Sequence, residues 1–92
     1  MVRVIFATAL RSATNGEQEI ELEFSGDIKS LLALLSERYG EGFRKRLLDA
    51  DGYLKRYVNA YLDGRDVRFI KGKDTPINGS SEILLLPAVS GG

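Results

Sequence analysis

The sequence predicts an α+β fold, in which a mixed sheet of four to five strands carries one main helix on one face and ends in a flexible C-terminal tail. Three observations support it: two strand-like stretches open the chain, an amphipathic helix follows them, and further strand patterns close it. The 92 residues are enough for one modest hydrophobic core, so we expect a single domain over residues 1–92.

The two opening stretches are expected to pair as a β-hairpin. Residues 2–10 read VRVIFATAL, where Val2, Val4 and Phe6 recur with the two-residue period of a strand. Residues 17–24 read EQEIELEF, where glutamates alternate with mostly apolar residues, as in a strand with one buried face. An Asn-Gly dipeptide between the two stretches indicates the turn.

A helix is expected directly after this hairpin. Asp27 is suited to its first position, because an aspartate oxygen can accept a hydrogen bond from an unpaired amide of the first helical turn. Tyr39-Gly40 is expected to end the helix. The buried face follows the i, i+3, i+4, i+7 spacing and consists of Ile28, Leu31, Leu32 and Leu35.

The second half of the chain returns to strand patterns. We expect a helical turn and a loop at 41–55, a third strand at 56–62, a short fourth strand at 67–70, an irregular segment at 75–79 and a last strand at 82–89. Asp63-Gly64 is a strong turn dipeptide and ends the third strand. A hairpin, a helix and then strands is the order of the β-grasp fold, which implies parallel first and last strands at the sheet centre.

The composition argues against several classes of function. The chain has no cysteine and no histidine, so it offers no disulfide, no thiol nucleophile and no metal site built from these ligands. Thirteen basic and thirteen acidic residues cancel, which disfavours a nucleic-acid partner held through phosphates. We find neither a leader-like segment nor a membrane-spanning stretch, and no paired carboxylates typical of an enzyme. We therefore expect a cytoplasmic protein without metal, nucleic-acid or membrane partners.

The alternation of the strands assigns side chains to two sheet faces. We expect the helix to cover Val2, Val4, Phe6, Ile20, Leu22, Phe24, Val58, Ala60, Leu62, Ile83 and Leu85. One helix covers only one face, so an apolar patch is expected on the other face, formed by Ile5, Tyr57, Tyr61, Leu84 and Leu86. Such a patch usually marks an interaction surface. The alternative is that residues 41–55 or 65–80 fold over it.

Two charged features have a simple and a functional interpretation. The glutamates of residues 17–24 most simply discourage pairing with another chain, and a match to a basic partner is the alternative. Two short runs, Arg44-Lys45-Arg46 and Lys55-Arg56, form a local basic cluster. The default interpretation of this cluster is a solvated surface, and a salt-sensitive contact with an acidic partner is the alternative.

Three stretches resemble the MoaD/ThiS family of ubiquitin-like sulfur carriers. The ending LLLPAVSGG (84–92) is similar to that family's last strand, proline, small or apolar pair and terminal Gly-Gly. VNAYLDGRDVRF (58–69) resembles its third strand and turn, and LRSATNGEQE (10–19) resembles the first hairpin of its longer members. Those longer members include the carrier of mycobacterial cysteine synthesis and the small modifiers of archaea.

The resemblance implies a chemistry for the C-terminus. The Gly92 carboxylate would attack ATP on an E1-like adenylyltransferase of the MoeB/ThiF type and would then become a thiocarboxylate. A molybdopterin synthase large subunit, a cysteine synthase or a thiazole synthase would accept the sulfur. The chain itself would be a carrier and co-substrate rather than an enzyme, or the small subunit of a synthase complex. It would bind no cofactor, because the activating enzyme uses the ATP.

The expected site combines this tail with the open sheet face. The reacting residues are Gly92 and Gly91, and the partner-binding residues are Ile5, Tyr57, Tyr61, Leu84, Leu86, Pro87, Val89 and Ser90. Residues 89–92 form the reactive tail, which spans about 13–14 Å when fully extended. Two glycines without Cβ atoms make it thin enough for a narrow channel. Without cysteine, the C-terminal acyl carbon is the place left for carried sulfur.

Three other interpretations remain open. The same activated tail could form an isopeptide with a target lysine, as in a ubiquitin-like protein modifier. The chain could instead be a passive binding module with an inert tail, because β-grasp domains serve many functions. Finally, a terminal Gly-Gly can simply be a frayed end, and Pro87 can simply terminate a strand.

Overall fold

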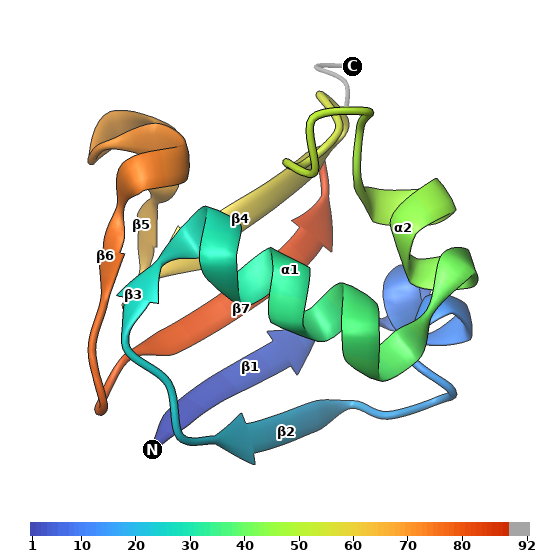
Figure 1. Ribbon diagram of the computed structural model, residues 1–92, viewed down its shortest axis with the longest axis horizontal. Helices are drawn as coiled ribbons and strands as arrows, with labels where there is room; N and C mark the ends of the chain where they lie inside the picture. Colours follow the sequence, from blue (N-terminus) through green and yellow to red (C-terminus); the bar gives the residue numbers. More distant parts are fainter. Residues whose placement is uncertain (89–92) are drawn as a thin grey trace.

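A five-stranded mixed sheet runs through the computed structural model, which describes residues 1–88 (Figure 1). The strands lie in the order β2-β1-β7-β4-β5. Their bounds are β1 Val2–Phe6, β2 Glu19–Leu22, β4 Val58–Leu62, β5 Arg65–Asp66 and β7 Glu82–Pro87. Strands β1 and β7 are parallel neighbours at the centre, and the other pairs are antiparallel. This topology confirms the β-grasp prediction.

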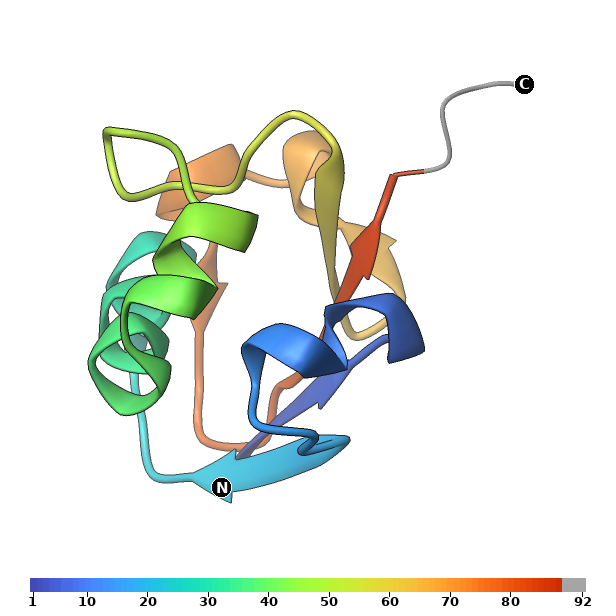
Figure 2. The same cartoon turned by 90° about the vertical axis from the view of Figure 1, so that its right-hand side faces the viewer.

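Helix α1 (Ile28–Tyr39) crosses one face of this sheet, as the spacing of its apolar residues predicts (Figures 1 and 2). The carboxylate of Asp27 accepts a hydrogen bond of 2.8 Å from the amide of Ser30, which confirms the expected N-cap. At the other end Gly40 has φ +84°, a left-handed conformation that glycine adopts without strain. Both helix boundaries were therefore predictable from local chemistry.

Shorter elements close the remaining edges of the core. They are the 3-10 helices η1 (Thr8–Ala13), η2 (Val67–Phe69) and η3 (Gly72–Asp74), helix α2 (Glu41–Leu47), and the two-residue strands β3 (Gly26–Asp27) and β6 (Pro76–Ile77). Helix α2 packs against α1 and η1, and η3 packs against α1. The predicted helical turn within 41–55 is thus confirmed as α2.

Three strand predictions were wrong in detail. The strand expected within 2–10 ends at Phe6, because the next residues turn into η1 and thereby bury Leu10 and Ala13. The short strand expected at 67–70 is η2, since the carboxylate of Asp66 accepts the amide of Arg68 at 2.9 Å and turns the chain; the strand there is β5. The irregular 75–79 contains β6, which pairs with β3 in a second small sheet.

The core lies between α1 and the sheet. Every side chain expected to face the helix is either buried or packs against the core. Segments outside α1 and the central strands add further core residues, which the periodicity did not predict: Leu10, Ala13, Phe43, Leu47, Leu48, Leu54, Val67 and Ile77. Among residues 1–88, no helix combines the length and the apolar character needed to cross a membrane.

Candidate functional site

Strand β7 positions the candidate site, because it is central in the sheet and leads directly to the C-terminal residues. Its side chains alternate: Ile83 and Leu85 are fully buried, whereas Leu84 is only partly buried. Opposite Leu84, the register places Ile5 on β1 and Tyr61 on β4. These three side chains therefore form one row across three strands, on the face away from α1.

This row belongs to an open apolar face, which we define as Ile5, Tyr57, Tyr61, Leu84 and Leu86. The Tyr57 side chain is 57% exposed, and the other four are partly exposed. Helices α1 and α2 both lie on the opposite side of the sheet (Figure 2). The alternative that 41–55 covers the face is therefore wrong, and η3 within 65–80 also packs against α1 instead.

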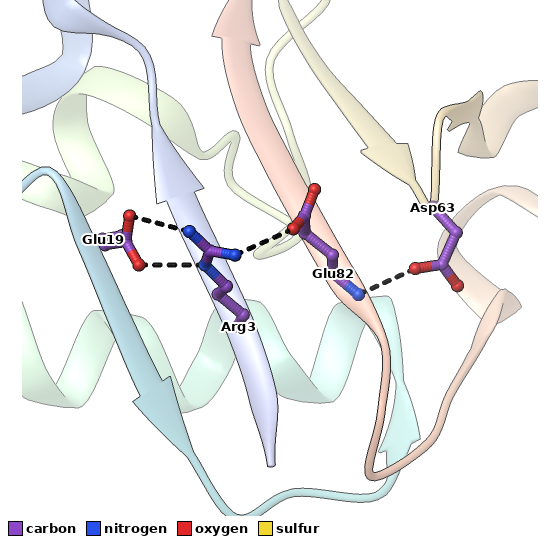
Figure 3. Close-up of polar contacts among 4 residues, drawn as sticks. All are labelled: Arg3, Glu19, Asp63 and Glu82. Atoms are coloured by element: carbon purple, nitrogen blue, oxygen red, sulfur yellow. Dashed lines mark hydrogen bonds and ion pairs between the residues drawn. The ribbon is translucent and has the colours of Figure 1, made fainter.

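An ion-pair network lies next to the open apolar face on the same side of the sheet, at the start of β1 and β7 (Figure 3). The guanidinium of Arg3 contacts both carboxylate oxygens of Glu19, at 2.9 and 3.2 Å. It also reaches the carboxylate of Glu82 at 3.4 Å. Asp63 accepts a hydrogen bond of 2.9 Å from the Glu82 amide, which connects the network to the β4–β5 turn. Glu19 is thus paired rather than only exposed on an edge strand.

These contacts shift the ionisation of the two partners in the expected directions. The hydrogen bonds from Arg3 hold the pKa of Glu19 below its ordinary value. The same bonds raise the pKa of the Arg3 guanidinium. The side chains of Arg3, Glu19 and Glu82 are about half exposed, so solvent screens these two ion pairs and their contribution to stability is small. Their main effect is to make this half of the face polar.

The face therefore changes in character along β7. It is charged at Glu82 and apolar at Leu84 and Leu86, the two positions that approach the C-terminal end of the strand. The apolar half is thus the half beside the exit of the chain. A partner that took the C-terminal residues would meet apolar side chains first and charged ones farther away.

The exit itself is held by β4. Pro87 lies opposite Val58, on the helix side of the sheet, and is partly buried. The amide of Ala88 donates a hydrogen bond of 2.8 Å to the carbonyl of Tyr57. The remaining predicted site residues, Val89, Ser90, Gly91 and Gly92, lie outside the described residues. Within residues 1–88, no cluster of three acidic side chains is placed to hold a metal ion.

Comparison with known proteins identifies the family. The sequence model of the ThiS family matches residues 4–92, from β1 to the last residue. This chain belongs to the ThiS family. The match includes the terminal Gly-Gly that the sequence singled out, and the β-grasp topology agrees with it.

Relatives of this ThiS-family chain include carriers and modifiers. The sulfur carrier protein CysO of Mycobacterium tuberculosis is 37% identical over 94 residues, which cover 99% of this chain and 98% of that protein. A chain of the Amycolatopsis orientalis BexX/CysO complex is 30% identical with a TM-score of 0.84, at full coverage of both chains. Small archaeal modifier protein 1 of Methanosarcina acetivorans is 27% identical with a TM-score of 0.80, covering 99% of this chain and 95% of that one.

Sequence reasoning missed Arg3 as the centre of the ion-pair network. The signal was present, since Arg3 lies between Val2 and Val4 in the first strand and therefore faces away from the core. Its partners depend on the register of β1 with β2 and β7, which the sequence did not specify. Phe69, whose side chain is 77% exposed on η2, was missed because 67–70 was expected to be a strand.

Proposed function

We propose that this chain is a sulfur carrier whose C-terminal Gly92 is adenylated by an E1-like enzyme and converted to a thiocarboxylate. The observation that carries this proposal is the ThiS-family match, which extends through Gly92. The similarity to the CysO sulfur carrier over nearly the whole of both chains supports it. The lack of cysteine and histidine leaves no thiol or imidazole on this chain for the chemistry.

The proposed cycle has three steps, and the partners supply the catalysis. A Gly92 carboxylate oxygen attacks the α-phosphate of ATP, pyrophosphate leaves, and an acyl-adenylate forms. A persulfide then displaces AMP, and a thiol cleaves the resulting acyl disulfide, which leaves a thiocarboxylate on the chain and a disulfide on the donor side. The thiocarboxylate sulfur forms a bond to the acceptor, and water then cleaves the acyl bond of the carrier. The acceptor keeps the sulfur, and the carrier returns as a carboxylate. The partner enzyme positions the reacting end and stabilises the developing charge, so the chain is a co-substrate. Because the proposed cycle consumes ATP, we propose that it takes place in the cytoplasm.

In this proposal the sheet holds the base of the tail and binds the enzyme, and the tail carries the reacting carboxylate. Strand β7 is fixed on both sides by β1 and β4, so the base of the tail at Ala88 has a defined position. The open apolar face lies beside this base, and we propose that the activating enzyme docks there. Docking at the open apolar face would position Gly92 in the active site of the enzyme. Contacts of the tail alone would not hold it there.

An adenylation assay tests the first step. The activating enzyme of the same organism is incubated with the chain, ATP and labelled pyrophosphate, and the incorporation of label into ATP is measured. We expect exchange with the intact chain and none after removal of Gly92. Gly79→Ala is the matched control, because a methyl group at this exposed glycine meets no atom within 4 Å. Full exchange without Gly92 would overturn the proposal.

A narrower question is which enzyme accepts the sulfur. The 37% identity with CysO favours a cysteine synthase over the molybdopterin synthase large subunit or a thiazole synthase. A complex that contains CysO was crystallised from Amycolatopsis orientalis, which supports a stable assembly between carrier and partner. Offering the thiocarboxylated chain to each enzyme separately, and measuring the product, decides among the three.

Protein modification is the second candidate function. The similarity to the archaeal small modifier protein, at 27% identity and a TM-score of 0.80, favours it. The activated Gly92 would then form an isopeptide with a target lysine. Trypsin would leave residues 74–92 on that lysine, because Lys73 is the last basic residue of the chain. Detection of this remnant on cellular proteins would support modification, and conjugates that persist without Gly92 would contradict it.

A further inference from the structure

A basic groove lies beside the base of the C-terminal tail. It has a volume of about 350 Å³ and lies between η1, α2, the start of β4 and the end of β7. Three cationic side chains line it, namely Lys45, Arg46 and Lys55, together with Tyr57 and Pro87. We call these five residues the exit groove. The two basic runs of the sequence, far apart along the chain, thus meet at the point where β7 ends.

Backbone carbonyls hold two of these cations in place. The Arg46 guanidinium donates a hydrogen bond of 2.8 Å to the carbonyl of Ala9 on η1. The ammonium of Lys55 donates to the carbonyl of Lys45 on α2. The Lys55 amide also donates to the Leu47 carbonyl at 2.8 Å, which ties the segment before β4 to the end of α2. The cations are therefore arranged around the groove by the fold.

No acidic side chain neutralises the exit groove from within. None of the residues that line it is acidic. Within residues 1–88, the ion pairs of the protein involve other basic residues: Arg3, Arg38, Arg44 and Arg68. Lys45 and Arg46 are exposed, and Lys55 is partly exposed. Over residues 1–88, the groove therefore carries positive charge that no described ion pair neutralises.

The positive charge of the exit groove is a local feature and does not reflect a basic chain. The net charge is zero, so the positive charge at the exit is balanced elsewhere. Among the exposed carboxylates, Glu19 and Glu21 on β2 and Glu82 at the start of β7 lie next to Arg3, away from the groove, whereas Asp49 and Asp51 lie in the loop between α2 and β4. The end of β7 thus lies beside a local cluster of cations, Lys45, Arg46 and Lys55. A partner with acidic groups around its tail channel would attract this end first.

We infer that the exit groove binds an acidic surface of the activating enzyme. This surface would lie at the mouth of the enzyme channel that receives the C-terminal tail of the chain. The inference rests on the proposed function and adds to it a second contact, which adjoins the open apolar face at Tyr57 and extends toward α2 and η1. Apolar groups of Leu10, Val58 and Pro87 also line the groove. Together with the zero net charge, they suit a protein surface better than a bare phosphate or a nucleic acid.

Charge reversal tests this inference. Lys45→Glu combined with Arg46→Glu reverses the exposed cations, and Lys71→Glu combined with Lys73→Glu is the control, because both residues are exposed beside or on η3. Adenylation kinetics with the chain as varied substrate are measured at several NaCl concentrations. We expect kcat/KM of the groove variant to fall about tenfold at low salt, with kcat nearly unchanged. The difference should shrink as salt is added, and the control should match the wild type.

The outcomes separate this inference from the proposed function. Thermal unfolding of each variant shows first that it is folded, and Lys45→Glu alone serves if the double variant is not, since no described side-chain hydrogen bond depends on the Lys45 ammonium. If the wild type is active and the folded groove variant has an unchanged kcat/KM, the inference about the exit groove is overturned and the proposed function is not. A fall confined to kcat would also overturn it as a docking surface. A wild-type chain that is not adenylated at all would overturn both proposals.

Discussion

At the scale of single residues, the clearest link between sequence and structure is Asp27. Its carboxylate accepts the amide of Ser30 at the first turn of α1, and this hydrogen bond lowers the pKa of Asp27. A cap of this kind depends only on neighbours in sequence, which is why the sequence predicted it. Arg3 is the opposite case, since its partners lie 16 and 79 residues away in the chain.

The cap gives a pH prediction with a definite sign. Because the pKa of Asp27 is lower in the folded protein, its contribution is present at neutral pH and is lost as pH falls through that folded pKa, below the ordinary value of about 3.9. Asp27→Ala should therefore lower the urea midpoint at pH 7 and have a smaller effect at acidic pH.

The matched control for the cap is Asp27→Asn. An asparagine oxygen can still accept the Ser30 amide but does not titrate, so this variant should retain most of the stability at pH 7. Equilibrium urea unfolding at a series of pH values measures all three proteins. An equal loss for Asp27→Ala at pH 7 and well below the aspartate pKa would contradict the assignment of the carboxylate as the cap.

At the scale of elements, β7 carries two functions on its two faces. Leu85 is fully buried against α1, whereas Leu84 contributes to the open apolar face between Ile5 and Tyr61. A truncation of Leu85 to alanine should cost about 2–5 kcal/mol of unfolding free energy. A substitution of Leu84 should instead affect binding to the activating enzyme, because successive side chains of a strand point to opposite faces of the sheet.

Leu84→Asp tests the role of the open apolar face. We expect a folded protein whose kcat/KM with the activating enzyme falls about tenfold or more, since a carboxylate would be buried against apolar side chains on docking. Leu34→Asp is the control, because this exposed leucine of α1 lies on the other side of the sheet. A folded Leu84→Asp chain that is adenylated at the full rate would contradict the docking role.

Some secondary-structure elements could be predicted from the sequence, and others could not. Helix α1 and the central strands were predictable because their apolar periods extend over several residues. Strands β3 and β6 were not, since each has two residues and exists only because Gly26 and Asp27 pair with Ile77 and Pro76 across the fold. The 3-10 helix η1 was missed for a similar reason: the burial of Leu10 and Ala13, a tertiary effect, decides where β1 ends.

At the scale of the whole molecule, the candidate site was partly predictable. The open apolar face follows from the parity of β1, β4 and β7, which the sequence displays directly. The exit groove does not, because it needs α2 and the start of β4 to meet beside Pro87. The combined picture is a carrier with an ion-pair network around Arg3 at one end of the sheet. Beside the end of β7 lie the open apolar face and the basic exit groove, which meet at Tyr57.

The measurement that tests the central claim most directly is the mass of the C-terminal peptide after activation. The chain is incubated with its activating enzyme, ATP, a persulfide sulfur donor and a thiol that cleaves the acyl disulfide, and is then digested with trypsin. We predict that peptide 74–92 gains the mass difference between sulfur and oxygen, and that every other peptide is unchanged. An unaltered peptide 74–92 from a reaction in which ATP is consumed, or sulfur found on any other peptide, would contradict the account of Gly92 as the carrier of sulfur.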